Sequence, residues 1–258
     1  MFISSQDLKK IYQDDSVLIL DARSYKDYSK GHIPGSVSLD LFSFHWADTS
    51  QKGLVSFGEH MRKILSYAGI DENKKIIFYD HSSGMLAARG VWMCLYFSHP
   101  DVQMLDGGLS KWTKENLPTQ TESTIYKPTN LTTPINPSII IGFEELNENI
   151  GKVTIIDARS PDEFDGTMPR AARGGHIPTA KNIDWNNNLD DSGKLKSDSE
   201  LESLYTMDKE YPIVTYCQGA YRAANSYLSL KKIGFKNVKV YLGSWGEWGN
   251  NLKLPIEK

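Results

Sequence analysis

An internal duplication constrains the fold of this chain more than any other feature of its sequence. The segment Asp21–Ser24 recurs as Asp157–Ser160, and Gly31–Pro34 recurs as Gly175–Pro178, in the same order. The first pair is offset by 136 residues and the second by 144, so the second copy holds eight extra residues, at 167–174. A repeat of this length indicates two related domains rather than a solenoid of short units.

Within each copy, short apolar runs rich in β-branched residues alternate with stretches of helical periodicity. The predicted strands are Val17–Leu20, Ile76–Tyr79 and Val102–Leu105, and in the second copy Val153–Ile156, Ile213–Tyr216 and Val238–Tyr241. The predicted helices are Glu59–Ala68, Ala87–Phe97 and Arg222–Lys232. This alternation predicts an α/β fold, with a parallel sheet in each domain covered by helices on both faces. Ligand sites in such sheets lie at the carboxyl ends of the strands.

The two copies are separated by Leu117–Pro137, which contains four prolines and many threonines. This composition is typical of an extended linker. We place the boundary near residue 130, with a first domain at 1–125 and a second at 138–258.

The composition of the 258 residues, 40% hydrophobic and 24% charged, is that of an ordinary globular protein. A net charge of −3 gives no basic footprint for nucleic acid or an anionic membrane. No apolar run reaches the roughly 18 residues of a membrane span, and Met1–Lys10 has no apolar signal core, so a cytoplasmic location is expected. The only two cysteines, Cys94 and Cys217, lie far apart, which excludes a disulfide framework.

Cys217 has the setting of a nucleophile. It follows a predicted strand and opens the short loop Cys217–Arg222, after which a helix begins. Such a loop can turn its backbone N–H groups inward as an anion nest, while the helix N-terminus and Arg222 add positive charge. These features favour the thiolate, which is the reactive form. Cys94 lies in an apolar helical run, Val91–Phe97, and is interpreted as a core residue.

The first copy serves as an internal control, because it has Asp80–Met85 where the second has Cys217–Arg222. It lacks both the cysteine and the arginine. We therefore expect the first domain to keep the fold and to have no thiol chemistry.

In this combination the sequence resembles the rhodanese family in its tandem two-domain form, and the resemblance covers nearly the whole chain. The motifs that carry it are Asp157–Arg159 with Glu163 and Phe164, Gly174–Pro178, Cys217–Arg222 and Gly243–Trp248. The resemblance implies two tandem rhodanese-like domains. It also implies a reaction in which Cys217 takes the outer sulfur of thiosulfate, releases sulfite, and passes the sulfur from a persulfide to cyanide or a thiol.

The resemblance implies Cys217 and Arg222 as catalytic residues and requires no metal or organic cofactor. The substrate-binding residues are expected to be Gln218, Gly219, Ala220, Tyr221 and Arg173. Arg173 and Arg170 lie in the insert of the second copy, for which solvated loop charges are the alternative interpretation. The expected partners are a small-molecule sulfur donor and a thiophilic acceptor, which includes a thiol-bearing protein, but no nucleic acid or membrane.

Three alternatives to a thiosulfate enzyme stay open. Phosphatases that share this fold have a Cys-x5-Arg loop, whereas Cys217–Arg222 has the shorter Cys-x4-Arg form that favours sulfur. Mercaptopyruvate enzymes of the family carry a Cys-Gly-Ser-Gly-Val-Thr-like loop, from which Gln218 and Tyr221 depart. A non-catalytic persulfide carrier would use the same cysteine.

Other repeated residues favour structural roles because both copies have them. Asp157 and Arg159 are interpreted as a structural ion pair, like Asp21 and Arg23 in the first copy. His32 and His176 are assigned to turns, and Trp245 and Trp248 to packing.

Overall fold

The computed structural model describes all 258 residues, and their contacts divide them into two compact units. The first unit contains residues 1–44, 58–136 and 189–195, and the second contains 45–57, 137–188 and 196–258. Each unit therefore includes one segment that the sequence division assigned to the other domain. No helix combines the length and the apolar composition needed to span a bilayer.

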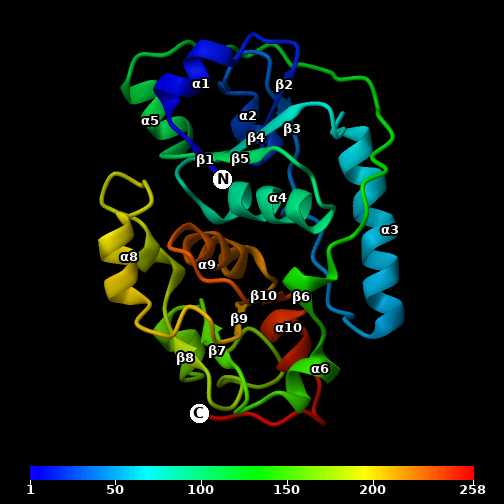
Figure 1. Cartoon of the computed structure of the whole chain (residues 1–258), viewed down its shortest axis with the longest axis vertical. Coiled ribbons are helices and arrows are strands. Elements are labelled where there is room, and N and C mark those ends of the chain that lie inside the picture. The colour runs from blue at the N-terminus through cyan, green and yellow to red at the C-terminus, as the bar shows by residue number, and fades with distance from the viewer. The chain divides into compact units, whose positions relative to one another are not determined.

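The first unit is built on a parallel five-stranded sheet of order β1-β5-β4-β2-β3 (Figure 1). Its strands are β1 (Phe2–Ile3), β2 (Val17–Asp21), β3 (Val37–Ser38), β4 (Lys75–Tyr79) and β5 (Val102–Leu105). The helices of this part of the chain are α1 (Ser5–Ile11), α2 (Tyr25–Tyr28), α3 (Gln51–Tyr67), α4 (Met85–Tyr96) and α5 (Gly108–Lys114). Helix α4 packs on β4 and β5, and α1 and α5 cover the opposite face.

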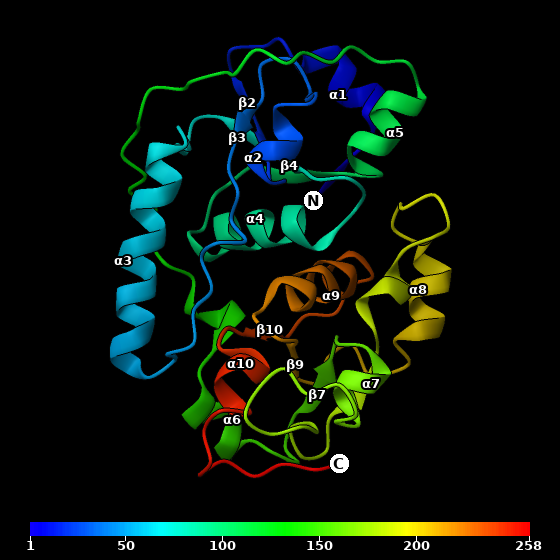
Figure 2. The same ribbon diagram turned by 180° about the vertical axis from the view of Figure 1, so that it is seen from behind.

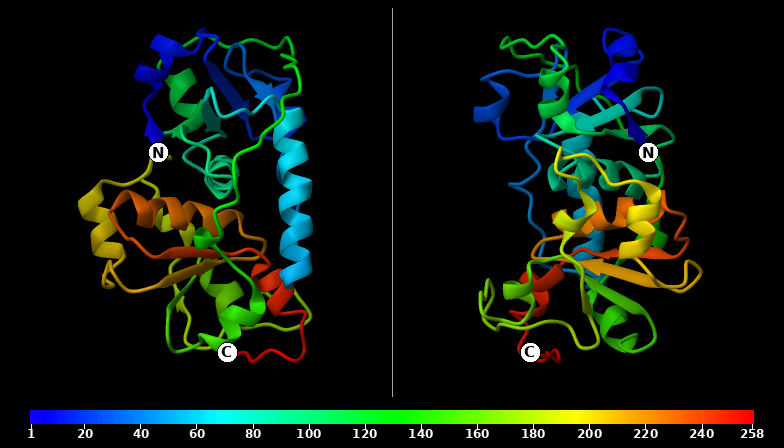
Figure 3. Two further views of the ribbon diagram at one scale, coloured as in Figure 1. Left: turned by 45° about the vertical axis from the view of Figure 1, so that its right-hand side comes forward. Right: turned by 90° about the vertical axis from the view of Figure 1, so that its left-hand side faces the viewer.

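The second unit repeats this architecture with a parallel sheet of order β6-β10-β9-β7-β8. Its strands are β6 (Ile140–Ile141), β7 (Thr154–Asp157), β8 (Lys181–Asn182), β9 (Ile213–Tyr216) and β10 (Val238–Tyr241). Its α-helices are α6 (Phe143–Glu148), α7 (Pro161–Phe164), α8 (Asp198–Leu204), α9 (Tyr221–Lys232) and α10 (Ser244–Trp248), with short 3-10 turns at Pro137–Ile139 and Trp185–Asn188. Figure 2 and both views of Figure 3 show α9 along one face of this sheet and α6 and α10 on the other.

The predicted fold class is confirmed, and all six predicted strands are present. The central strands are buried on both faces, which explains why they were recognisable as continuous apolar runs. The two-residue strands β1, β3, β6 and β8 were not predicted, because two residues carry no periodic pattern.

The two halves also share their internal supports. In each, an arginine is paired with a buried aspartate two residues earlier, at 2.6 Å in both Arg23–Asp21 and Arg159–Asp157. The same two guanidinium groups donate to the carbonyls of Gly31 and Gly175, which lie in the Gly-His-Ile-Pro turns. The predicted structural role of these ion pairs is therefore confirmed.

The remaining repeated side chains are structural as well. His32 stacks on Tyr28 and His176 on Phe164, each with 3.7 Å between ring centroids. Trp245 and Trp248 are fully buried, which confirms their predicted packing role.

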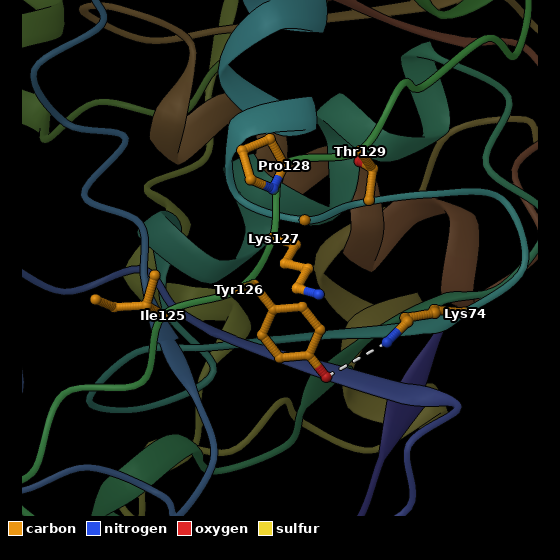
Figure 4. Close-up of a pocket in the computed structure, with 7 residues that line it drawn as sticks. Lys74, Ile125, Tyr126, Lys127, Pro128 and Thr129 are labelled. Carbon is orange, nitrogen blue, oxygen red and sulfur yellow. Dashed lines mark hydrogen bonds between the residues drawn. The ribbon is translucent and has the colours of Figure 1, made fainter.

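The linker after the first sheet is extended, as predicted, and is fixed along the first unit. Thr129 donates its backbone N–H to the Ser66 carbonyl at 2.9 Å, and Leu131 donates to the Ser66 hydroxyl at 3.1 Å. Lys74 lies 4.6 Å from the ring centroid of Tyr126 and donates to its hydroxyl (Figure 4).

Candidate active site

Cys217 lies between the end of β9 and the start of α9 and is 1% exposed. Its backbone N–H donates to the Ser244 hydroxyl at 3.2 Å, and its carbonyl accepts the Trp245 N–H at 2.8 Å. The loop that begins here is thus attached to the start of α10. Cys94, in contrast, lies inside α4 with no exposed surface, and burial raises the pKa of its thiol.

Ser244 shapes this loop, a role that its place in the motif Gly243–Trp248 did not indicate. Its hydroxyl accepts the N–H groups of Cys217 and Ala220, at 3.2 and 3.0 Å, and donates to the Tyr241 carbonyl at 2.9 Å. Both Ser244 and Ala220 have left-handed backbones, with φ of 52° and 67°. Such conformations cost non-glycine residues on the order of 1 kcal/mol or more and are concentrated at functional sites. The counterpart of Ser244 in the first copy is Gly108, with φ of 57°.

The loop presents several backbone donors that the protein itself does not use. No protein acceptor engages the N–H groups of Gln218, Gly219 or Arg222. They belong to the turn that follows the sulfur-bearing residue and the first turn of α9. Backbone N–H groups in this arrangement form a nest suited to an anion.

The first unit shows how such a loop holds an anion. Asp80 occupies the position of Cys217, and its buried carboxylate accepts four backbone N–H groups of its own loop and helix at 3.0–3.2 Å. These donors belong to Ser82, Gly84, Leu86 and Ala87. The loop Asp80–Met85, which we call the silent loop, therefore binds its own carboxylate, and this carboxylate fills the nest.

Arg222, at the start of α9, forms a two-point ion pair with Glu163 of α7. Its Nη1 lies 2.5 Å from Oε2 and its Nη2 lies 2.9 Å from Oε1. Burial alone would raise the pKa of Glu163, but the hydrogen bonds and charge of Arg222 lower it to about 2. Burial likewise opposes the charge of Arg222, but Glu163 and the neighbouring Cys217 raise its pKa. Arg222 thus faces both the carboxylate and the sulfur, with three of its five N–H donors left for other partners.

The insert at 167–174 places its two arginines differently. Arg170 has a 56% exposed side chain, 3.7 Å from Glu163, and its carbonyl accepts the Gln218 side-chain amide at 3.1 Å. Arg173 is instead bound to four carbonyls, those of Trp248, Gly249, Asn251 and Leu254. Arg173 therefore fixes the chain after α10, whereas Arg170 lies beside the Glu163–Arg222 pair.

The other predicted substrate-binding residues lie within the loop but contribute in different ways. Gln218 and Gly219 offer backbone N–H groups, whereas the Ala220 N–H is used by Ser244. The Tyr221 side chain is buried and lies 5.0 Å, centroid to centroid, from the ring of His45.

His45 is a neighbour of the loop that no sequence pattern indicated. It is exposed, and its ring lies where a Cβ on Gly219 would come within 2.6 Å. Residue 219 must therefore be glycine unless His45 moves.

Comparison with known proteins is consistent with this geometry. The family model described as Rhodanese-like domain matches residues 4–115 and again residues 143–251. The sulfur carrier protein TtuD of Thermus thermophilus is 32% identical over all of this chain and 96% of its own. The thiosulfate sulfurtransferase of Azotobacter vinelandii is 32% identical over all of this chain and 97% of its own.

A solved structure is similar over the same extent. The SseA structure from Escherichia coli, described as a 3-mercaptopyruvate sulfotransferase with the rhodanese fold, superposes with a TM-score of 0.80 at 27% identity. The match covers 95% of this chain and 98% of SseA. These proteins share the sulfur-transfer class but differ in donor and in role.

Proposed function

This chain belongs to the rhodanese family as a tandem two-domain sulfurtransferase, and on that premise we propose that it transfers the outer sulfur of thiosulfate through a persulfide on Cys217. The observation that carries the proposal is the contrast between the two loops. Asp80 accepts the N–H groups of its own loop, among them that of Ser82, whereas the N–H of Gly219, the counterpart of Ser82 in the Cys217 loop, has no protein acceptor.

In the first half-reaction, the Cys217 thiolate attacks the outer sulfur of thiosulfate. The S–S bond of thiosulfate breaks, and sulfite leaves with the bonding electron pair. The terminal sulfur of the new persulfide carries the negative charge, which the free loop N–H groups stabilise. In the second half-reaction, cyanide or a thiol attacks that terminal sulfur and the Cys217 thiolate is restored.

The sulfonate oxygens of the donor are assigned to Arg222 and Arg170. Glu163 holds two N–H groups of Arg222, so the guanidinium is oriented before the donor arrives. Arg170 is exposed and near the same carboxylate, which leaves it free to turn toward an anion. Arg173 is assigned a positioning role, because its donors are used by backbone carbonyls.

The sequence comparisons support two further candidates within the same chemistry. Similarity to SseA favours 3-mercaptopyruvate as donor, and similarity to TtuD favours a persulfide carrier. The near-complete burial of Cys217 favours small donors and acceptors over a bulky protein thiol.

Initial rates with the two donors test this proposal. Thiosulfate turnover is followed by the release of sulfite, and mercaptopyruvate turnover by the release of pyruvate, with cyanide as the common acceptor. We expect a larger kcat/KM for thiosulfate. A larger value for mercaptopyruvate would assign the chain to the other donor, and no turnover of either would favour the carrier.

A further inference from the structure

The first unit contains a pocket at the position that corresponds to the active site. It has a volume of about 280 Å³ and is bounded by Arg23, Asp27, Asp40, Phe42, Met85 and Leu86. We name it the silent-loop pocket. Ligand pockets usually have volumes of about 300–1,000 Å³, so this one suits a small molecule.

Several residues of the silent-loop pocket occupy positions that match residues around Cys217 in the second unit. The repeat offsets align Asp27 with Glu163, and Met85 with Arg222. The Asp40 carboxylate accepts the N–H two residues later at 3.0 Å, and its counterpart Asp184 makes the same bond at 2.9 Å. The two copies therefore share these positions, while the arginine of the second copy is a methionine in the first.

The replacement of Arg222 by Met85 changes the charge that a ligand would meet, from a cation in the second unit to carboxylates in the first. Met85 replaces the guanidinium of Arg222, and the anion nest behind it is filled by Asp80. Arg23 is paired with Asp21, so its charge is balanced. Asp27 and Asp40 remain as carboxylates on the rim, and only Asp27 has a lysine partner, Lys30 at 3.1 Å.

The apolar residues of the lining indicate which chemical groups the ligand should carry besides its charge. Phe42 is 46% exposed, and Met85 and Leu86 are half-buried beside it. An aromatic ring and a thioether next to a carboxylate suit a cation with an apolar body. We propose that the silent-loop pocket binds a small organic cation, an amine attached to an aromatic or alkyl group. This inference does not depend on the sulfur donor proposed above.

Titration of the full-length, nitrogen-15-labelled chain with benzylamine tests the proposal. Benzyl alcohol and phenylacetate serve as matched neutral and anionic probes. We expect saturable shifts of the Phe42, Met85 and Leu86 amide signals with benzylamine, with a Kd on the order of 1 mM.

Two variants and a matched control sharpen the test. Asp40→Asn keeps the oxygen that accepts the Phe42 N–H and removes the charge, so it should weaken benzylamine binding by roughly threefold or more. Met85→Arg restores the charge of the second copy and should abolish binding. Asp184→Asn, the same change at the counterpart, should leave binding unchanged. An equal response to benzyl alcohol, a preference for phenylacetate, or no shift up to about 10 mM benzylamine would overturn the proposal.

Discussion

Arg222 and Glu163 are joined by two hydrogen bonds, Nη1 to Oε2 at 2.5 Å and Nη2 to Oε1 at 2.9 Å, across 59 residues of sequence. This pair orients the guanidinium beside Cys217. Two roles of Arg222 then have to be distinguished: it supplies positive charge, and it presents a planar set of donors.

Replacing Arg222 with lysine should separate these roles. Lysine keeps the positive charge but cannot bridge Glu163 and the donor together, so kcat/KM for thiosulfate should fall about a hundredfold, or about 2–3 kcal/mol. The rate of Cys217 alkylation by iodoacetamide should keep its pH dependence, because the loop N–H groups remain. Near-normal thiosulfate kinetics in this variant would exclude the orientation role.

The ion pair should also make stability depend on pH. The pKa of Glu163 is lowered to about 2 in the folded chain, from an ordinary 4.5. A group with a depressed folded pKa stabilises above its unfolded pKa, and this contribution is lost as the pH falls from about 4.5 toward 2. With solvent screening allowed for, we expect the contribution to the free energy of unfolding to be about 2 kcal/mol.

Denaturant unfolding of the wild type and of Glu163→Gln measures this contribution. The difference in stability should be largest above pH 5 and should shrink as the pH approaches 2. A difference that is independent of pH over this range would show that the charge of Glu163 is not the cause.

Ser244 should hold the active loop through its hydroxyl. Ser244→Ala leaves the Cys217 and Ala220 N–H groups without an acceptor, at a cost of about 1–3 kcal/mol, and keeps the left-handed backbone. Ser244→Gly loses the same bonds but relieves the strain, so it should be the more stable of the two variants. Thermal unfolding of both compares them directly, and a less stable glycine variant would contradict the role of strain.

Asp80→Cys should not create a second active loop. The variant has no arginine at the matching position, Met85, and it leaves four backbone N–H groups without their carboxylate. We expect one persulfide per chain after thiosulfate treatment and a loss of stability of about 2–4 kcal/mol. Two persulfides per chain, counted by mass, would show that the cysteine alone is sufficient.

The sequence predicted the central strands to within one residue, because each is a buried apolar run between loops. It placed the start of the third helix at Glu59, whereas α3 begins at Gln51. Gly53 and Gly58 lower the helical propensity of residues 51–58, so this first part of α3 was not recognisable as helical from the sequence. The grouping of residues 45–57 and 189–195 with the opposite units depends on long-range contacts, for which a local pattern gives no signal.

The local arrangement of the candidate site could be predicted from the sequence, whereas the contacts between distant residues could not. The loop Cys217–Arg222 was recognisable because strand, nest and helix follow one another in sequence. The partnership of Arg222 with Glu163, and the difference between Arg170 and Arg173, depend on which side chains meet in space. The role of Asp80 could have been expected, since a carboxylate directly before a glycine-containing loop and a helix is well placed to accept their N–H groups.

The most direct test of the account is the mass of the Cys217 peptide after treatment of the chain with thiosulfate and rapid alkylation. We expect an increase of about 32 Da, one sulfur atom, on Cys217, which cyanide removes with release of thiocyanate. Cys217→Ser should show no added sulfur, whereas Cys94→Ser should behave like the wild type because Cys94 is buried in the first unit. Added sulfur on Cys94, or an unmodified Cys217 in a chain that still turns over thiosulfate, would contradict the central claim.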